Sequence, residues 1–269
     1  MRKIDITEFQ QLGAGALNRL FEIFKKHNIR AVIAYGTLLG AVRHEGFIPW
    51  DEDIDLLVDY GDCGKIKHLV KNELSEDFRY VDWKMDSDDC MFGVARIYYK
   101  KLLKNPHKKS IPMELNIDLF YTAFKKDDPS VYEYMKTGTY IISLCNTWLR
   151  YYKNQKSKMT LKILIKRIIG RYDEESDFTP KHRDKAILKN FNKLRKGKDL
   201  CIRLYTSDLH LGIYKNFDYN KTTLLKFNGF YLPALQNYKE ILENDYGDYL
   251  KPVIYYADYR NNFDFYVID

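Results

Sequence analysis

The stretch from Ala34 to Asp59, AYGTLLGAVRHEGFIPWDEDIDLLVD, constrains the fold of this chain more than any other. Its last part runs from an acidic cluster into an apolar run, which is typical of a strand entering a core. Side chains alternate between the faces of a strand, so Asp51, Asp53 and Asp55 are predicted to project together. Three carboxylates on one face repel one another unless a cation lies among them. Oxygen-only ligands of this kind suit a hard ion such as Mg²⁺ or Mn²⁺.

The residues just before this cluster predict a phosphate-binding turn. Residues 31–35 are typical of a buried strand, and this strand breaks at Gly36 and Thr37. Glycine lets a substrate approach the backbone, and the Thr37 hydroxyl and nearby N–H groups can meet a phosphate if residues 38–43 begin a helix. The predicted order is therefore strand, Gly-Thr turn, short helix and Asp-x-Asp on the next strand.

The same stretch resembles the signature of a known family. Residues 36–44 read GTLLGAVRH and residues 46–55 read GFIPWDEDID. These two motifs resemble the signature of the LicD-type phosphocholine transferases, which share it with the fukutin-related phosphosugar transferases. The wider nucleotidyltransferase superfamily has a Gly-Ser or Gly-Thr turn before a metal-binding Asp-x-Asp. The resemblance implies an α+β fold, with a nucleotidyltransferase-like mixed sheet and flanking helices.

Two other interpretations of the acidic cluster compete with a metal site of this type. A solvated acidic surface is common, but it does not explain the Gly-Thr turn and the buried strand before the cluster. A calcium loop is also compatible with the first three aspartates. It fails at Leu56, where glycine is required, and at Asp62, where glutamate normally closes the site.

A third carboxylate is predicted downstream, at Asp118. Residues 114–120, ELNIDLF, place this aspartate in an apolar strand, where an ionised carboxylate is costly to bury unless it is paired or bound to metal. Asp118 therefore fits the third carboxylate of the superfamily, brought beside Asp53 and Asp55 by sheet pairing, although an exposed strand edge is the alternative. The resemblance also places a basic residue near the site at Arg96, which is otherwise an ordinary surface charge.

The remaining candidates are assigned to substrate binding. Gly36 and Thr37 would cradle phosphate, and Arg43 would add a bidentate contact. Trp50 stacks against donor or sugar, or else anchors the core beside Pro49. Asp51 belongs to the acidic face, and Lys251 is a candidate for a second phosphate contact.

The chain is expected to divide into three parts. Residues 1–125 would form the catalytic core, residues 126–200 a basic helical region, and residues 201–269 a C-terminal segment that closes the active site, with the C-terminal region helical overall. Helices are expected at residues 131–150, 158–171 and 180–196. Motifs at residues 227–233 and 246–252 resemble the closing motifs of the family, except that Asn228 stands where glutamate is usual.

The N-terminal residues predict a helix that covers the sheet. Thr7 is the expected cap, and the helix is expected to end at Asn28. Apolar residues recur at helical spacing along it, namely Leu12, Ala16, Leu20, Ile23 and Phe24.

Charge and hydropathy constrain partners and location. The net charge of +7 and pI of about 8.9 favour an anionic partner. No run approaches the roughly 18 apolar residues of a membrane span, and no signal-peptide core is seen, so we expect a cytoplasmic protein. Residues 158–171 combine an apolar stripe with regularly spaced lysines. They are interpreted either as a core-packing helix or as one that meets an anionic membrane at its inner face.

The resemblance implies a Mg²⁺- or Mn²⁺-dependent transfer of a phospho-alcohol. The donor would be a CDP-alcohol such as CDP-choline. The acceptor would be a hydroxyl of a cell-surface glycan (lipopolysaccharide, teichoic acid or capsule), and this glycan can be lipid-linked. Asp53 and Asp55 would hold the metal, and Asp118 would share it and act as base. One alternative is nucleotidyl transfer from a nucleoside triphosphate to a small molecule or protein. Another is a nucleic-acid-binding module that uses the basic helices, but no binding motif supports it and no nucleic acid is expected.

Overall fold

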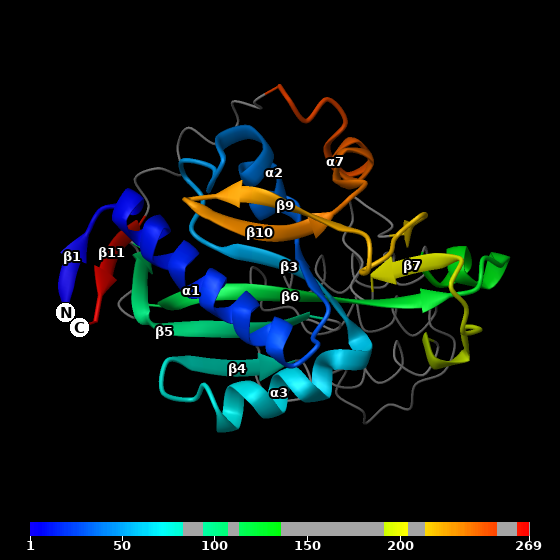
Figure 1. Ribbon diagram of the computed structural model, residues 1–269, viewed down its shortest axis with the longest axis horizontal. Coiled ribbons are helices and arrows are strands. Elements are labelled where there is room, and N and C mark those ends of the chain that lie inside the picture. The colour runs from blue at the N-terminus through cyan, green and yellow to red at the C-terminus, as the bar shows by residue number, and fades with distance from the viewer. Residues whose placement is uncertain (83–93, 107–112, 136–190, 204–212, 252–262, 269) are drawn as a thin grey trace, which may run out of the picture. The chain divides into compact units, whose positions relative to one another are not determined.

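The structure is a computed structural model, and it describes residues 1–82, 94–106, 113–135, 191–203, 213–251 and 263–268 (Figure 1). The chain divides into two compact units. The first comprises residues Met1–Ala123, Leu200–Tyr205 and Tyr214–Asp269, and the second comprises Phe124–Asp199 and Thr206–Ile213. All candidate site residues belong to the first unit, so the description that follows concerns that unit.

A mixed sheet forms the centre of the first unit. Its path is β1-β11-β5-β6-β3-β2, with β4 paired to β5 and with β7 paired to β6 and β8. The strands of this sheet are β1 (Arg2–Ile4), β2 (Ala31–Ile33), β3 (Ile54–Asp59), β4 (Phe78–Asp82), β5 (Val94–Pro106), β6 (Met113–Lys125), β7 (Leu200–Arg203), β8 (Ile213–Tyr214) and β11 (Phe263–Val267). Strands β3 and β6 run parallel, whereas β2–β3 and β5–β6 are antiparallel pairs, so the sheet is mixed, as predicted.

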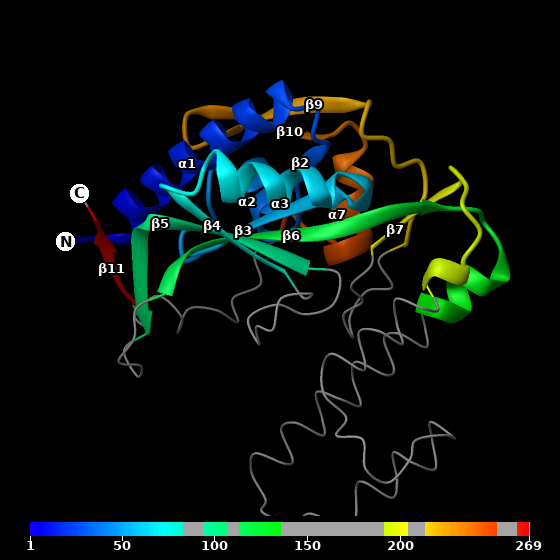
Figure 2. The same cartoon turned by 90° about the horizontal axis from the view of Figure 1, so that it is seen from below.

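The helices of this unit lie against the sheet and a separate hairpin. They are α1 (Ile6–Lys26), α2 (Tyr35–His44), α3 (Cys63–Asn72) and α7 (Tyr238–Tyr246), with a short 3₁₀ turn, η1 (Tyr60–Asp62), before α3. The hairpin pairs β9 (Thr222–Phe227) with β10 (Phe230–Leu235). Figures 1 and 2 show α1, α3 and the hairpin on the same face of the sheet.

Helix α1 begins two residues earlier than the sequence predicted. Asp5, rather than Thr7, is its N-cap, and the Asp5 carboxylate accepts a hydrogen bond of 2.8 Å from the Glu8 N–H. The helix ends at Lys26, and Asn28 has a left-handed φ of 52°. Leu12 was assigned to the buried stripe but is 38% exposed, because the buried face of α1 is centred instead on residues such as Gly13 and Leu17.

The order of strand, short helix and strand around the acidic cluster is confirmed. Helix α2 starts at Tyr35, one residue after β2 ends, and it ends at His44. The next residue, Glu45, is its C-cap and has a left-handed φ of 51°. Gly40 permits this sharp exit, because a β-carbon there would lie 2.4 Å from the carbonyl oxygen of Gly46. The chain then forms a loop, and β3 begins only at Ile54, so Asp51 and Asp53 precede the strand rather than lie within it as predicted.

The prediction of a helical C-terminal region is wrong for the described residues. Between residues 200 and 268 the structure has strands β7 to β11 and a single described helix, α7. Asn228 and Gly229 form the turn of the β9–β10 hairpin, with left-handed φ angles of 47° and 85°. Asn-Gly is a strong hairpin signal, because both turn residues must adopt positive φ.

Most of the predicted basic helical region lies outside the described residues. Residues 129–135 and 191–193 are helical, whereas the amphipathic segment 158–171 is not described. None of the described helices is long and apolar enough to cross a membrane.

Candidate metal and active site

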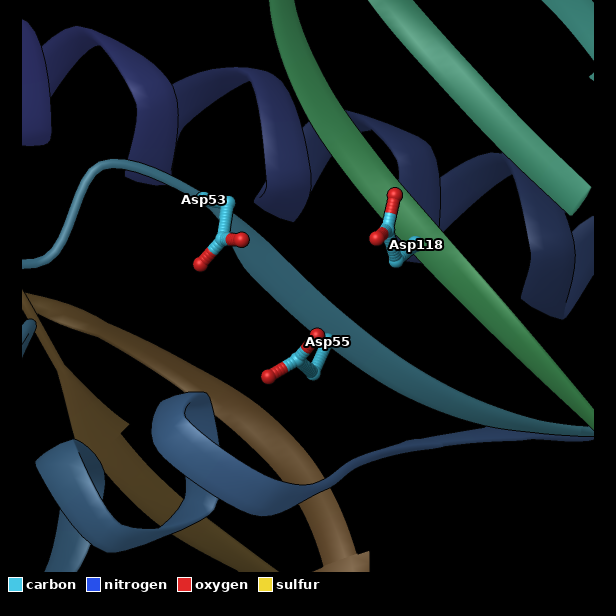
Figure 3. A group of neighbouring side chains, drawn as sticks. All are labelled: Asp53, Asp55 and Asp118. Atoms are coloured by element: carbon cyan, nitrogen blue, oxygen red, sulfur yellow. The ribbon is translucent and has the colours of Figure 1, made fainter. Parts of the chain in front are cut away.

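Three aspartate side chains from two strands converge on one face of the sheet (Figure 3). Asp53 lies just before β3, Asp55 lies on β3, and Asp118 lies opposite Asp55 in the parallel register with β6. One carboxylate oxygen from each residue lies within 4.8 Å of those of the other two. Figure 3 shows the side chains on the face of the β3–β6 pair that is turned away from α1. Sheet pairing thus brings together the three carboxylates that the sequence predicted as a group.

The electrostatics of this cluster favour a bound cation. Burial, followed by repulsion from Asp53, Asp118 and Asp51, raises the pKa of Asp55 well above its ordinary value. Burial and the nearby charge of Asp53 also raise the pKa of Asp51, to about 8. Both shifts mean that the carboxylates are held together at a cost in free energy, which a positive charge among them would remove.

Two residues in the first turn of α2, Gly36 and Thr37, contact Asp55. The backbone N–H of Gly36 donates a hydrogen bond to the Asp55 carboxylate. A β-carbon at Gly36 would lie 3.0 Å from an Asp51 carboxylate oxygen and 3.6 Å from one of Asp55, so glycine leaves room for both acids. The buried Thr37 hydroxyl accepts a hydrogen bond of 2.9 Å from the Asp55 N–H. Thr37 therefore fixes the start of β3, and its contact with a phosphate stays a prediction.

Arg96 on β5 forms a forked ion pair with Asp118. Its Nε and Nη2 atoms donate to the two Asp118 oxygens at 2.8 and 3.2 Å. Asn116 adds a third hydrogen bond to Asp118, at 3.1 Å. Asp118 is only 7% exposed, so these contacts compensate the burial of its charge and orient it toward the other two acids. The predicted basic residue near the site is thus Arg96, and its position is fixed by Asp118.

The other predicted substrate-binding residues are more dispersed. Trp50 is half-buried and directly precedes Asp51. Arg43 lies in the last turn of α2, at the opposite end of the helix from Gly36. The side chain of Lys251 is largely exposed and pairs with Asp248 at 2.8 Å. Roles in substrate binding for these three residues stay predictions.

Two residues near the acids were not singled out from the sequence. Burial, together with the negative charges of Asp55 and Asp51, raises the pKa of the Tyr246 phenol, so the end of α7 lies close to the site. Lys104 on β5 is 4% exposed and donates a hydrogen bond of 2.9 Å to the carbonyl oxygen of Glu52. Tyr246 lies within the closing motif at residues 246–252, whereas Lys104 gave no signal, because lysines are common at strand ends.

The donor set fits a hard divalent cation. Three carboxylates supply only oxygen ligands, and Asp118 is oriented by Arg96. Magnesium and manganese prefer such ligands and keep several waters or substrate oxygens in their coordination. The residues that could hold a metal ion are therefore Asp53, Asp55 and Asp118.

A mixed sheet that brings a short helix to an Asp-x-Asp and a third aspartate is the arrangement of a nucleotidyltransferase-type domain. Residues 28–138 match the family described as LicD/FKTN/FKRP, nucleotidyltransferase domain. The matched segment is less than half of the chain, and it contains every member of the aspartate triad.

Individual relatives extend this comparison beyond the matched domain. The chain is 24% identical, over 93% of each sequence, to the lipopolysaccharide cholinephosphotransferase LicD of Haemophilus influenzae. It is 57% identical over 35 residues to uncharacterized proteins of Rickettsia prowazekii and Rickettsia typhi, a match that covers 13% of this chain and 13% and 11% of theirs. The first of these similarities extends beyond the matched segment and includes the C-terminal strands.

Proposed function

We propose that this protein transfers a phospho-alcohol from a CDP-alcohol to a hydroxyl group of a cell-surface glycan and releases CMP. Phosphocholine is the proposed group, and CDP-choline the proposed donor. The observation that carries the proposal is the convergence of three carboxylates from β3 and β6 beside the first turn of α2. The similarity to a lipopolysaccharide cholinephosphotransferase supports the choice of substrate class.

The proposed chemistry is a single displacement at phosphorus. The acceptor oxygen forms a bond to the phosphorus that carries choline, while the bond from this phosphorus to the bridging oxygen breaks and CMP leaves with the electron pair. A Mg²⁺ or Mn²⁺ ion held by Asp53, Asp55 and Asp118 would neutralise the charge of the pyrophosphate and of the departing CMP. The proton of the acceptor hydroxyl passes to a carboxylate base, which we assign to Asp118.

The residues around the triad have separate proposed roles. The Gly36 N–H faces Asp55, and we propose that the first turn of α2, at Gly36 and Thr37, also meets a donor phosphate. Arg96 orients the Asp118 carboxylate, and part of this forked contact must loosen when Asp118 accepts a proton. Arg43, Trp50, Asp51 and Lys251 are proposed to contact the substrates.

A second candidate is nucleotidyl transfer, because the same triad and the matched domain would also serve a nucleoside triphosphate. The leaving group separates the two reactions, since the first releases CMP and the second releases pyrophosphate. Incubating the protein and Mg²⁺ with a panel of CDP-alcohols and nucleoside triphosphates, and assaying both products, tests both proposals. The Asp53→Asn variant is the control for contaminating hydrolases.

The proposed setting is the cytoplasmic side of a membrane, where a lipid-linked acceptor would lie. The segment 158–171 is the proposed contact with anionic lipid, from its apolar stripe and spaced lysines. Co-sedimentation of the protein with anionic vesicles should exceed that with neutral vesicles. Equal co-sedimentation would remove the proposed membrane contact without affecting the proposed reaction.

A further inference from the structure

The loop between α2 and β3 is neither helix nor strand, but it carries part of the candidate metal site. We call residues 45–53 the acidic loop, and it carries both Asp51 and Asp53. An irregular loop near a cluster of like charges needs its backbone groups held by other parts of the chain, because repulsion among the acids favours other conformations. The contacts that hold this loop therefore decide where its carboxylates lie.

Gln10 makes two hydrogen bonds to the backbone of the acidic loop. This residue lies on the buried face of α1 and is 7% exposed. Its side-chain amide nitrogen donates to the carbonyl oxygen of Ile48 at 3.0 Å and to that of Asp51 at 2.8 Å. Both donors of the amide nitrogen are thus used on two carbonyls of the loop, three residues apart, and the second belongs to an acidic residue of the site.

Two further side chains hold the loop on either side of these contacts. The Asn228 side-chain oxygen accepts a hydrogen bond of 2.9 Å from the Phe47 N–H, and the Asn228 N–H donates to the Glu45 carbonyl at 2.8 Å. Lys104 donates to the Glu52 carbonyl at 2.9 Å. The loop is therefore attached to the β9–β10 turn, to α1 and to β5 in succession, and Gln10 holds its middle.

We propose that Gln10 is a positioning residue for the metal site. Its two hydrogen bonds set the course of the chain from Ile48 to Asp51, and thereby the approach of Asp53 to Asp55 and Asp118. This inference rests on the proposed function, in that it assumes a divalent cation at the triad. Side chains outside the coordination shell that orient a metal site typically change metal affinity by roughly 10–100-fold when they are removed.

Gln10 allows a cleaner test than Lys104 because it carries no charge. Removing the Lys104 ammonium would make the site more negative, and this electrostatic change would favour cation binding while the loss of positioning would oppose it. Substitution of Gln10 leaves the charge of the site unchanged. A change in metal affinity can therefore be attributed to the course of the loop.

The experiment compares Gln10→Met with the parent in a background in which Trp83 and Trp148 are replaced by phenylalanine. Trp50, within the acidic loop, is then the single tryptophan, because the chain has three. Acrylamide quenching of Trp50 in metal-free protein reports the order of the loop, and titration with Mn²⁺, followed by Trp50 emission and by electron paramagnetic resonance, reports metal affinity. Gln236→Met, at an exposed glutamine after β10, is the matched control.

We expect Gln10→Met to increase quenching of Trp50 and to weaken Mn²⁺ binding by about 10-fold, with the control unchanged. Unchanged quenching, or unchanged Mn²⁺ affinity, would overturn the positioning role and leave Gln10 as a buried polar residue of the core. If Gln10→Met does not fold, as judged by circular dichroism, Gln10→Leu tests the same point, since its side chain is also uncharged and cannot donate to either carbonyl. A parent protein that binds no Mn²⁺ would instead refute the metal site of the proposed function, and the positioning role with it.

Discussion

The two faces of the β3–β6 pair use the same strands for opposite purposes. Ile54, Leu56 and Leu119 point to the face covered by α1 and are fully buried, with 0% exposure. Asp53, Asp55 and Asp118 alternate with them and point to the other face (Figure 3). A shift of one residue in either strand would exchange the two sets, so the apolar core also fixes where the acids lie.

The difference between the faces lies in their contribution to stability. Burying a leucine or isoleucine side chain stabilises the fold by about 1.5–3 kcal/mol, so the α1 face favours folding. The acidic face opposes folding in the absence of a cation, as the raised pKa values of Asp55 and Asp51 indicate. The core on one side of the sheet thus offsets the repulsion on the other, and substitutions on the two faces should have opposite consequences.

The largest effect is expected from Asp53→Asn and Asp55→Asn, which remove ligands on the acidic face. Turnover should fall by more than about 100-fold, since loss of a ligand exceeds the loss of an outer partner. The metal-free variants should be at least as stable as the parent protein, because one member of a like-charged cluster is neutralised. Product assays and urea denaturation measure the two quantities. Near-normal turnover at saturating Mg²⁺ would show that the metal ligands are wrongly assigned.

Asp118→Asn should distinguish the role of Asp118 from the roles of Asp53 and Asp55. If Asp118 is both ligand and base, its amide can still coordinate weakly but cannot accept the hydroxyl proton, so turnover should fall by about 100-fold or more while donor binding is weakened less. Asp53→Asn should weaken donor binding as well. Titration of CDP-choline with Mg²⁺ is compared with turnover in each variant, and Glu114→Gln on the same strand is the control. Normal turnover at saturating donor would mean that the base lies elsewhere.

Leu56→Ala tests the apolar face of the same strand. Truncation of this fully buried leucine should lower the free energy of unfolding by about 2–5 kcal/mol, through lost burial and a cavity. Turnover per folded molecule should remain close to that of the parent protein. Leu224→Ala, at a leucine that is 61% exposed, should change stability by less than about 0.5 kcal/mol. A large loss of turnover in folded Leu56→Ala would contradict the separation of the two faces.

Arg96→Met should destabilise the protein less than Leu56→Ala does. It removes the forked partner of Asp118 and should lower the free energy of unfolding of the metal-free protein by about 1–3 kcal/mol. Mn²⁺ should stabilise this variant more than the parent, since a cation at the triad would then be the remaining compensation for Asp118. Arg79→Met removes an exposed pair with Glu114 and should cost about 0–1 kcal/mol. Thermal denaturation measures the stabilisation by Mn²⁺. Equal stabilisation of Arg96→Met and the parent would count against Asp118 as a ligand of the cation.

Local patterns in the sequence were sufficient for the central elements. The alternation of acids and apolar residues predicted the two faces of β3, and the lone aspartate in the apolar stretch 114–120 predicted a partner strand. These predictions succeed because strand alternation depends on neighbouring residues only. The C-terminal strands were missed although Asn228 and Gly229 carried a hairpin signal, because that segment was interpreted as a family motif rather than by its turn chemistry.

The sequence by itself determined which residue types are available for the site, namely three carboxylates, a Gly-Thr turn and a nearby arginine. Only the tertiary structure decided that Asp55 lies opposite Asp118 and that Arg96 pairs with Asp118. It also decided that Gln10 donates hydrogen bonds to the acidic loop. Each of these contacts joins elements that are separated along the chain, and their geometry depends on the register of the whole sheet and on the packing of α1 against it. A glutamine in an amphipathic helix has the same local pattern whether it faces solvent or two carbonyl groups, so no local rule could distinguish the two.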